Sequence, residues 1–279
     1  MKYTIALAIM LISSISARPQ SALHSVVETE KAFARLAAEK GTRTAFLANM
    51  SDDAFVFVPE RTNGKAFWTA RGESKSLLSW APNFADIAAD GSFGYTTGNW
   101  EFRGKGKDDQ PGAFGDFITI WTRQADSKYK FTVDIGISHD KPAAYSTEWA
   151  KAADGTGTGK QNVKADEALK EFSDKVSKKG VAAAYATFAA NDIRLYREDK
   201  MPFLGKKAAA GQLSLEIGPV SFDTPVVQGA SSNLAYFLRG YQRTLPNGSV
   251  EKGNFFQIWK YRDGQWQIVL DILKPVPAK

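Results

Sequence analysis

The sequence predicts an α+β protein built from two similar domains, and three observations support this. The stretch 115–136, GDFITIWTRQADSKYKFTVDIG, recurs near the C-terminus as GNFFQIWKYRDGQWQIVLDIL at 253–273. In each half, helical patterns come first and strand patterns follow, which is the order of an α+β domain. The two halves also match at an almost constant offset, since Phe172 follows Phe33 by 139 residues. The chain therefore contains one fold twice.

The first half begins with two predicted helices. Val26, Phe33 and Ala37 recur at helical spacing within 23–40, with charged residues between them. Gly41 ends this helix, and a second helix follows directly. The other elements of this half are predicted as a second helix to residue 50, a strand at 54–59, a helix at 64–80 that loosens near Gly72, and strands at 84–89, 93–103, 113–124 and 129–138.

Residues 141–163 lose this periodicity and contain the sequence GTGTG at 155–159, which is typical of flexible linkers. GTGTG is not a phosphate loop, because such a loop needs a strand directly before it and a helix directly after it. We therefore place the first domain at 23–140 and the second at 164–279. The second domain is predicted to contain a helix at 164–179, a strand at 193–197, a helix from 205, and strands at 220–228, 233–243, 252–262 and 265–273.

The N-terminal residues 1–22 have the pattern of a secretory signal peptide. Lys2 is followed by a short apolar run and then by small residues, so cleavage is expected after Ala17 or Ala22. The apolar run is about half the roughly 20 residues that a membrane span needs. We expect export to the periplasm and no membrane contact after signal removal. The chain contains no cysteine, which excludes disulfides and a lipidated cysteine, and its mild net charge of +6 predicts no nucleic acid partner.

Three features together resemble a known family: the element order, the closing strand with a Trp–x–(x)–hydrophobic pattern, and the turn-rich link before it. They resemble the nuclear transport factor 2-like superfamily, and within it the SnoaL-like and ketosteroid-isomerase-like bacterial domains. The resemblance implies two tandem cone-shaped domains of the cystatin-like α+β barrel type, with helices packed on a strongly curved antiparallel sheet. It also implies a pocket for a small, largely apolar molecule at the open end of the cone. Family members include isomerases and dehydratases as well as non-catalytic binding modules, so the fold alone does not define the activity.

Asp134 and Asp271 are carboxylates within the otherwise apolar final strands FTVDIGI and IVLDIL. Burial in an apolar cone would raise the pKa of such a group toward the range that suits acid–base chemistry. The resemblance implies the same use of Asp, so Asp134 is the candidate catalytic residue. The alternative is a structural role for both, with hydrogen bonds from backbone N–H groups or from Arg103, Arg123 or Arg243.

Large aromatic side chains on the predicted sheets form the second candidate set. They could line a pocket and donate O–H or N–H groups to a ligand, or they could be core residues. The predicted ligand-binding residues are Trp68, Tyr95, Trp100, Trp121, Tyr196, Tyr236, Tyr241 and Asp271. We expect Trp68 and Trp80 to lie on the helix at 64–80. The histidines His24 and His139 are far apart, and His139 is expected at the surface, facing away from Asp134. We therefore predict neither a metal site nor a cofactor.

The sequence predicts an exported protein that binds a small apolar or aromatic molecule in one or both domains. An acid–base enzyme of the isomerase or dehydratase type, with Asp134 as the base, is an alternative. A non-catalytic structural or interaction module is a further alternative, in which the two domains pack sheet to sheet as a pseudo-dimer.

Overall fold

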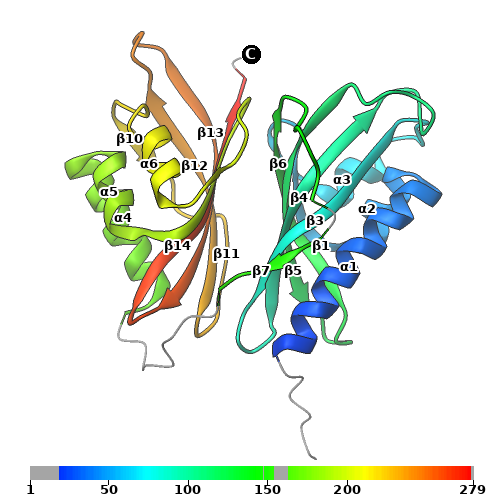
Figure 1. Cartoon of the computed structure of the whole chain (residues 1–279), viewed down its shortest axis with the longest axis horizontal. Coiled ribbons are helices and arrows are strands. Elements are labelled where there is room, and N and C mark those ends of the chain that lie inside the picture. Colours follow the sequence, from blue (N-terminus) through cyan, green and yellow to red (C-terminus); the bar gives the residue numbers. More distant parts are fainter. Residues whose placement is uncertain (1–18, 147, 154–162, 278–279) are drawn as a thin grey trace, which may run out of the picture.

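The computed structural model describes residues 19–146, 148–153 and 163–277, and it consists of two α+β domains (Figure 1). Each domain has a curved, open sheet of seven strands, so the α+β prediction is confirmed. The two sheets face each other in the middle of the molecule, and the helices cover their outer faces. The predicted signal peptide lies outside the described residues except for residues 19–22, which form the first turn of a helix.

In the first domain, helices precede and cover a sheet that is mostly antiparallel. Its elements are α1 (Pro19–Lys40), α2 (Thr42–Asn49), β1 (Met50–Phe57), β2 (Arg61–Asn63), α3 (Gly64–Thr69), β3 (Leu77–Ile87), β4 (Phe93–Arg103), β5 (Ala113–Arg123), β6 (Tyr129–His139) and β7 (Ala150–Lys151). The strand order is β2-β1-β6-β5-β4-β3-β7, and β3 to β6 form an antiparallel meander. The strand β1 joins β6 in parallel, which brings the start of the domain beside its last long strand.

The second domain repeats this arrangement. Its elements are α4 (Ala165–Lys179), α5 (Val181–Phe188), β8 (Ala189–Arg197), β9 (Phe203–Leu204), α6 (Lys206–Leu213), β10 (Val220–Phe222), β11 (Val227–Ala230), β12 (Leu234–Thr244), β13 (Val250–Arg262) and β14 (Gln265–Val276). The main order is β10-β12-β13-β14-β8-β9, and β11 also pairs with β12. The strand β8 joins β14 in parallel, as β1 joins β6.

Two element predictions were wrong. The predicted helix at 64–80 ends at Thr69, and the strand β3 begins at Leu77. The cause is strand pairing: β4 has 11 residues, and its last five find their backbone partners in the first five residues of β3. The single strand predicted at 220–228 is two short strands, β10 and β11. Pro225 lies between them, and proline has no N–H to donate to a strand ladder.

Part of the predicted linker packs on the first domain. Ala150 and Lys151 form β7 and pair with β3, and the Ala152 N–H donates to the Ala85 carbonyl at 3.0 Å. Ala152 is buried, and Trp149 packs against the core of the first domain. The GTGTG sequence lies outside the described residues.

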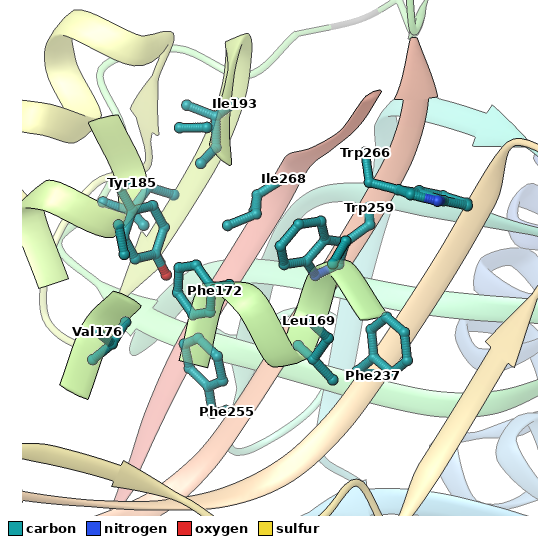
Figure 2. Packing of buried hydrophobic residues seen from close by; sticks show 14 of the residues in the cluster. Leu169, Phe172, Val176, Tyr185, Ile193, Phe237, Phe255, Trp259, Trp266 and Ile268 are labelled. Atoms are coloured by element: carbon teal, nitrogen blue, oxygen red, sulfur yellow. The ribbon is translucent and has the colours of Figure 1, made fainter. Parts of the chain in front are cut away.

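Each domain has a core between its helices and its sheet. Figure 2 shows the core of the second domain, where Leu169, Phe172 and Val176 point from α4 toward the sheet. These residues recur at helical spacing, which gives α4 one apolar face. The ring centroid of Phe172 lies 5.2 Å from that of Tyr185 and 5.8 Å from that of Trp259. Aromatic packing therefore fills the interior of this domain.

A third core lies between the two sheets. The rings of Phe93 and Tyr236 meet there, with centroids 5.1 Å apart. A buried ion pair also joins the domains, with the Lys260 Nζ 2.5 and 2.7 Å from the two carboxylate oxygens of Asp86. Both faces of each sheet are thus covered, which explains why the central strands carry apolar residues on both sides.

Candidate functional site

The first domain contains a cavity of about 400 Å³ on the helix side of its sheet. Its volume lies within the range of small-molecule sites in proteins. Most of its wall is aromatic or aliphatic. The lining residues are Phe46, Phe57, Leu78, Trp80, Trp100, Phe102, Ala113, Phe117, Asp134, Gly136, Ile137, Ser138 and Lys274. Lys274 belongs to the second domain, and every other lining residue belongs to the first.

Trp100 forms part of the wall because two glycines leave room for its indole ring. A Cβ atom on Gly115 would lie 2.4 Å from the Trp100 ring and 2.0 Å from the Ile137 carbonyl oxygen. A Cβ atom on Gly136 would lie 3.4 Å from the Trp100 Nε1. Glycine at these two positions of β5 and β6 therefore lets the indole lie across the sheet.

We expect Gly115→Ala to lower the free energy of unfolding by about 1–3 kcal/mol, because the added methyl group overpacks this site. Displacement of Trp100 should also reduce the volume or change the shape of the cavity. Urea unfolding followed by circular dichroism measures the first effect. Gly112→Ala is the control, because Gly112 is exposed and a Cβ atom there would meet no atom within 4 Å. Equal midpoints for the two variants would contradict the expected crowding.

Asp134 lies on β6, with its side chain at the cavity wall. The Thr119 hydroxyl on β5 donates a hydrogen bond of 2.9 Å to its Oδ2, as expected for residues directly opposite each other on paired strands. Burial raises the pKa of Asp134 to about 7, and the nearby carboxylate of Glu30 contributes in the same direction. A carboxyl group with a pKa of about 7 both takes up and releases protons at neutral pH.

Glu30 is a second carboxylate beneath the cavity wall, which the sequence analysis did not select. It is fully buried on α1 and accepts hydrogen bonds from Trp80 Nε1 at 2.6 Å and Trp121 Nε1 at 2.9 Å. The Thr96 hydroxyl donates a third, of 2.6 Å. Burial raises the pKa of Glu30, and these hydrogen bonds oppose that shift. The available signal was its position, since Glu30 lies four residues after Val26 on the apolar face of the helix.

The equivalent carboxylate of the second domain has different surroundings. Asp271 is fully buried, and it accepts hydrogen bonds from Arg197 Nη1 at 2.6 Å, from Gln257 Nε2 at 3.1 Å and from the Tyr185 hydroxyl. Arg197 also binds Glu216, with Nε 2.6 Å from a carboxylate oxygen. Both carboxylate oxygens of Asp271 therefore have buried hydrogen-bond partners. The arginine among them is Arg197, and not Arg103, Arg123 or Arg243, which the sequence analysis considered.

Arg239 occupies the interior of the second domain at the position that Gly98 has in the first. The strand registers show this, because Gly98 pairs with Phe117 and Arg239 pairs with Phe255. The guanidinium carbon of Arg239 lies 4.0 Å from the centroid of the Phe222 ring. Burial lowers the pKa of Arg239 to about 10. The second domain thus has a large buried side chain at a position where the first domain has a glycine.

The structure places the other predicted ligand-binding residues away from the cavity. Three of them, Tyr95, Tyr196 and Tyr236, lie in the core between the two sheets. Trp121 and Tyr241 are buried in the helix-side cores of their domains. Trp68 packs on the first core, with its ring centroid 4.7 Å from that of Phe46. Of the predicted set, Trp100 and Asp134 line the cavity. Trp80 also lines it, although from β3 and not from a helix.

The expected surface position of His139 was wrong. His139 is buried between the sheets, and its Nε2 lies 2.8 Å from Asp116 Oδ2. The Asn99 amide donates to the other oxygen of Asp116 at 3.0 Å. The strand β6 continues through His139, which therefore pairs with Phe114 instead of turning into solvent. As the strand alternation indicates, its side chain points to the face opposite Asp134.

Within the part of the chain that the structure describes, no group of three or more His, Asp or Glu residues could hold a metal ion. None of the described helices is both long enough and apolar enough to cross a membrane.

No family model matches the chain, and no curated protein matches its sequence. Solved structures do match, and each covers about one domain. An NTF2-like protein of unknown function from Pseudomonas putida KT2440 is 16% identical over 38% of this chain and 80% of its own, with a TM-score of 0.33. A ketosteroid isomerase-like protein from Erwinia carotovora atroseptica is 16% identical over 40% of this chain and 94% of its own, with a TM-score of 0.35.

A protein of unknown function with a cystatin-like fold from Nostoc punctiforme is 15% identical over 40% of this chain and 89% of its own, with a TM-score of 0.34.

Proposed function

We propose that the cavity of the first domain binds a small, largely apolar molecule. The observation that carries this proposal is the cavity itself, which combines aromatic walls with one carboxyl group, Asp134, whose pKa is about 7. Apolar walls contribute binding free energy through the area they remove from water. A few polar groups in such a wall orient the ligand and supply specificity.

The pKa of Asp134 supports a second candidate function, acid–base catalysis without a cofactor. In that reaction the Asp134 carboxylate would remove a proton from a carbon next to a carbonyl group, which leaves an enolate and a protonated Asp134. If the substrate is a β,γ-unsaturated ketone, the enolate is conjugated, and return of the proton from Asp134 to the γ-carbon would give the α,β-unsaturated isomer. Thr119 and Glu30 would act as positioning residues, because Thr119 fixes one carboxylate oxygen and Glu30 raises the pKa of Asp134.

We also propose that the two domains act together as a pseudo-dimer. The apolar core between the sheets and the buried pair Asp86–Lys260 support this. In that case, denaturation of the second domain should abolish ligand binding by the first, which titration with a fluorescent ligand across a urea series would show.

The binding proposal is tested with a neutral aromatic probe, 2-(2-naphthyl)ethanol, by isothermal titration calorimetry. We expect the unmodified protein to bind it and Ala113→Trp to bind it at least tenfold more weakly, because the new indole fills the cavity. Ala38→Trp is the control, since Ala38 is exposed on α1. Absence of binding, or equal affinities in the two variants, would overturn the proposal.

The catalytic candidate is tested by exchange of the α-hydrogens of 1-tetralone with D2O, followed by proton NMR. We expect the enzyme-dependent rate to rise as the pH passes through about 7, because the ionised form of Asp134 is the base. Asp134→Asn should remove this rate. If the unmodified protein and Asp134→Asn exchange the ketone hydrogens equally at every pH, Asp134 is not a catalytic base. The binding proposal is then judged by the calorimetry alone.

A further inference from the structure

Lys274 lines the cavity of the first domain although it belongs to β14 of the second. Its Nζ lies 3.0 Å from Glu198 Oε2, and the other oxygen of Glu198 accepts the backbone N–H of Ser138 at 3.0 Å. Ser138 is on β6 of the first domain and also lines the cavity. One end of the cavity therefore lies at the interface between the two domains. The side chain of Lys274 lies at this end, with only 14% of its surface exposed.

The cavity has two chemically different ends. Asp134 and Ser138 lie on the same strand and the same face, four residues apart. A strand rises about 3.3 Å per residue, so Asp134 and Ser138 lie about 13 Å apart along β6. Between them the wall is formed by Trp100, Phe117 and other apolar groups. The cavity therefore suits an elongated molecule with a polar group at the end that meets Lys274.

We propose that the ligand is an apolar or aromatic molecule with a carboxylate group, and that Lys274 binds this carboxylate. This inference rests on the binding function proposed above, and it names the class of ligand. Among the described lining residues, Lys274 and Asp134 alone carry ionisable side chains. A lysine ammonium group has three N–H donors, and Glu198 accepts one of them. A charged acceptor makes the strongest hydrogen bond to the donors that remain.

The second domain thus has a defined part in the site. In its own sheet, the buried side chain of Arg239 and the network around Asp271 stand at the places equivalent to Gly98 and Asp134 of the first domain. Its contribution to the binding site is the residue that selects the ligand.

The test compares two probes of matched size, 2-naphthylacetate and 2-(2-naphthyl)ethanol, by calorimetry at pH 6. At that pH Asp134 is mainly protonated and does not repel the anion. We expect the unmodified protein to bind the carboxylate at least tenfold more tightly than the alcohol. Lys274→Met should weaken binding of the carboxylate at least tenfold and so remove this preference. Lys252→Met is the control, because Lys252 is an exposed lysine of the neighbouring strand that does not line the cavity.

Two results would overturn the inference. The first is equal affinity for the two probes in the unmodified protein. The second is an unchanged preference in Lys274→Met, which would mean that Lys274 only joins the two domains through Glu198. If Lys274→Met does not fold, Glu198→Gln decides instead: removal of the competing carboxylate should increase the preference, and an unchanged preference contradicts the proposal. Failure of the alcohol to bind at all would instead overturn the binding function itself.

Discussion

Replacing Asp271 with asparagine is expected to lower the free energy of unfolding by about 3–5 kcal/mol, because it breaks a buried ion pair. Asp271 has no exposed surface, and the guanidinium group of Arg197 lies 2.6 Å from its Oδ1. An amide in this place leaves Arg197 with Glu216 as its single anionic partner. The NH2 group of asparagine must also replace one of the two acceptor oxygens, so it faces the donors of either Arg197 or Gln257 and Tyr185, and at least one buried group loses its hydrogen bond.

The measurement is the urea midpoint at pH 7.5, followed by circular dichroism. Asp174→Asn provides the matched control, because it removes a carboxylate from an exposed pair with Lys170 on α4. Exposed pairs of this kind contribute about 0–1 kcal/mol. If both substitutions shift the midpoint by the same small amount, the network around Asp271 does not stabilise the second domain as the structure implies.

Replacing Asp134 with asparagine is expected to have the opposite effect above pH 7 and to stabilise the protein. The pKa of Asp134 is about 7 in the folded chain and near 4 in the unfolded chain. Between these values the folded state holds a proton that the unfolded state has released. The stability of the unmodified protein therefore falls as the pH rises from about 4 to about 7, and this loss is complete above pH 7.

A difference of about 3 pKa units corresponds to at most about 4 kcal/mol, and solvent screening reduces this figure because Asp134 is only half-buried. Asparagine does not ionise, so the variant should lose little stability between pH 5 and pH 8. Urea midpoints at these two pH values measure the effect, with Asp53→Asn on the exposed face of β1 as the control. A variant less stable than the unmodified protein at pH 8 would show that the Asp134 charge is compensated in the fold.

These opposite signs reflect a difference between the surroundings of the two carboxylates. Asp134 and Asp271 occupy equivalent places on the last long strand of each domain, opposite Thr119 and Gln257 respectively. Burial raises the pKa of both carboxyl groups. In the second domain the positive charge of Arg197 opposes this shift for Asp271, whereas in the first domain the like charge of Glu30 adds to it for Asp134. The first domain therefore has, beside its cavity, a carboxyl group without a cationic partner, which is the feature on which the proposed function rests.

The sequence by itself determined most of the elements and their duplication. The strands at 93–103, 113–124 and 129–138 were predicted to within one residue of β4, β5 and β6, because period-2 patterns depend on neighbouring residues alone. Asp134 could be selected for the same reason, since a carboxylate within an apolar strand is visible in the sequence. The helix predicted through Trp80 failed because the pairing of β3 with β4, a contact between distant segments, overrode the local pattern.

Only the tertiary structure decided which apolar face met which partner. Strand alternation separates Tyr95 from Trp100, but it does not say that one face meets the second sheet while the other lines a cavity. Glu30 became part of the site through its contacts with Trp80 and Trp121, which lie 50 and 91 residues away in the chain. Lys274 reaches the first domain only because the two sheets pack together. Such contacts depend on long-range packing, and neither periodicity nor spacing along the chain carries that information.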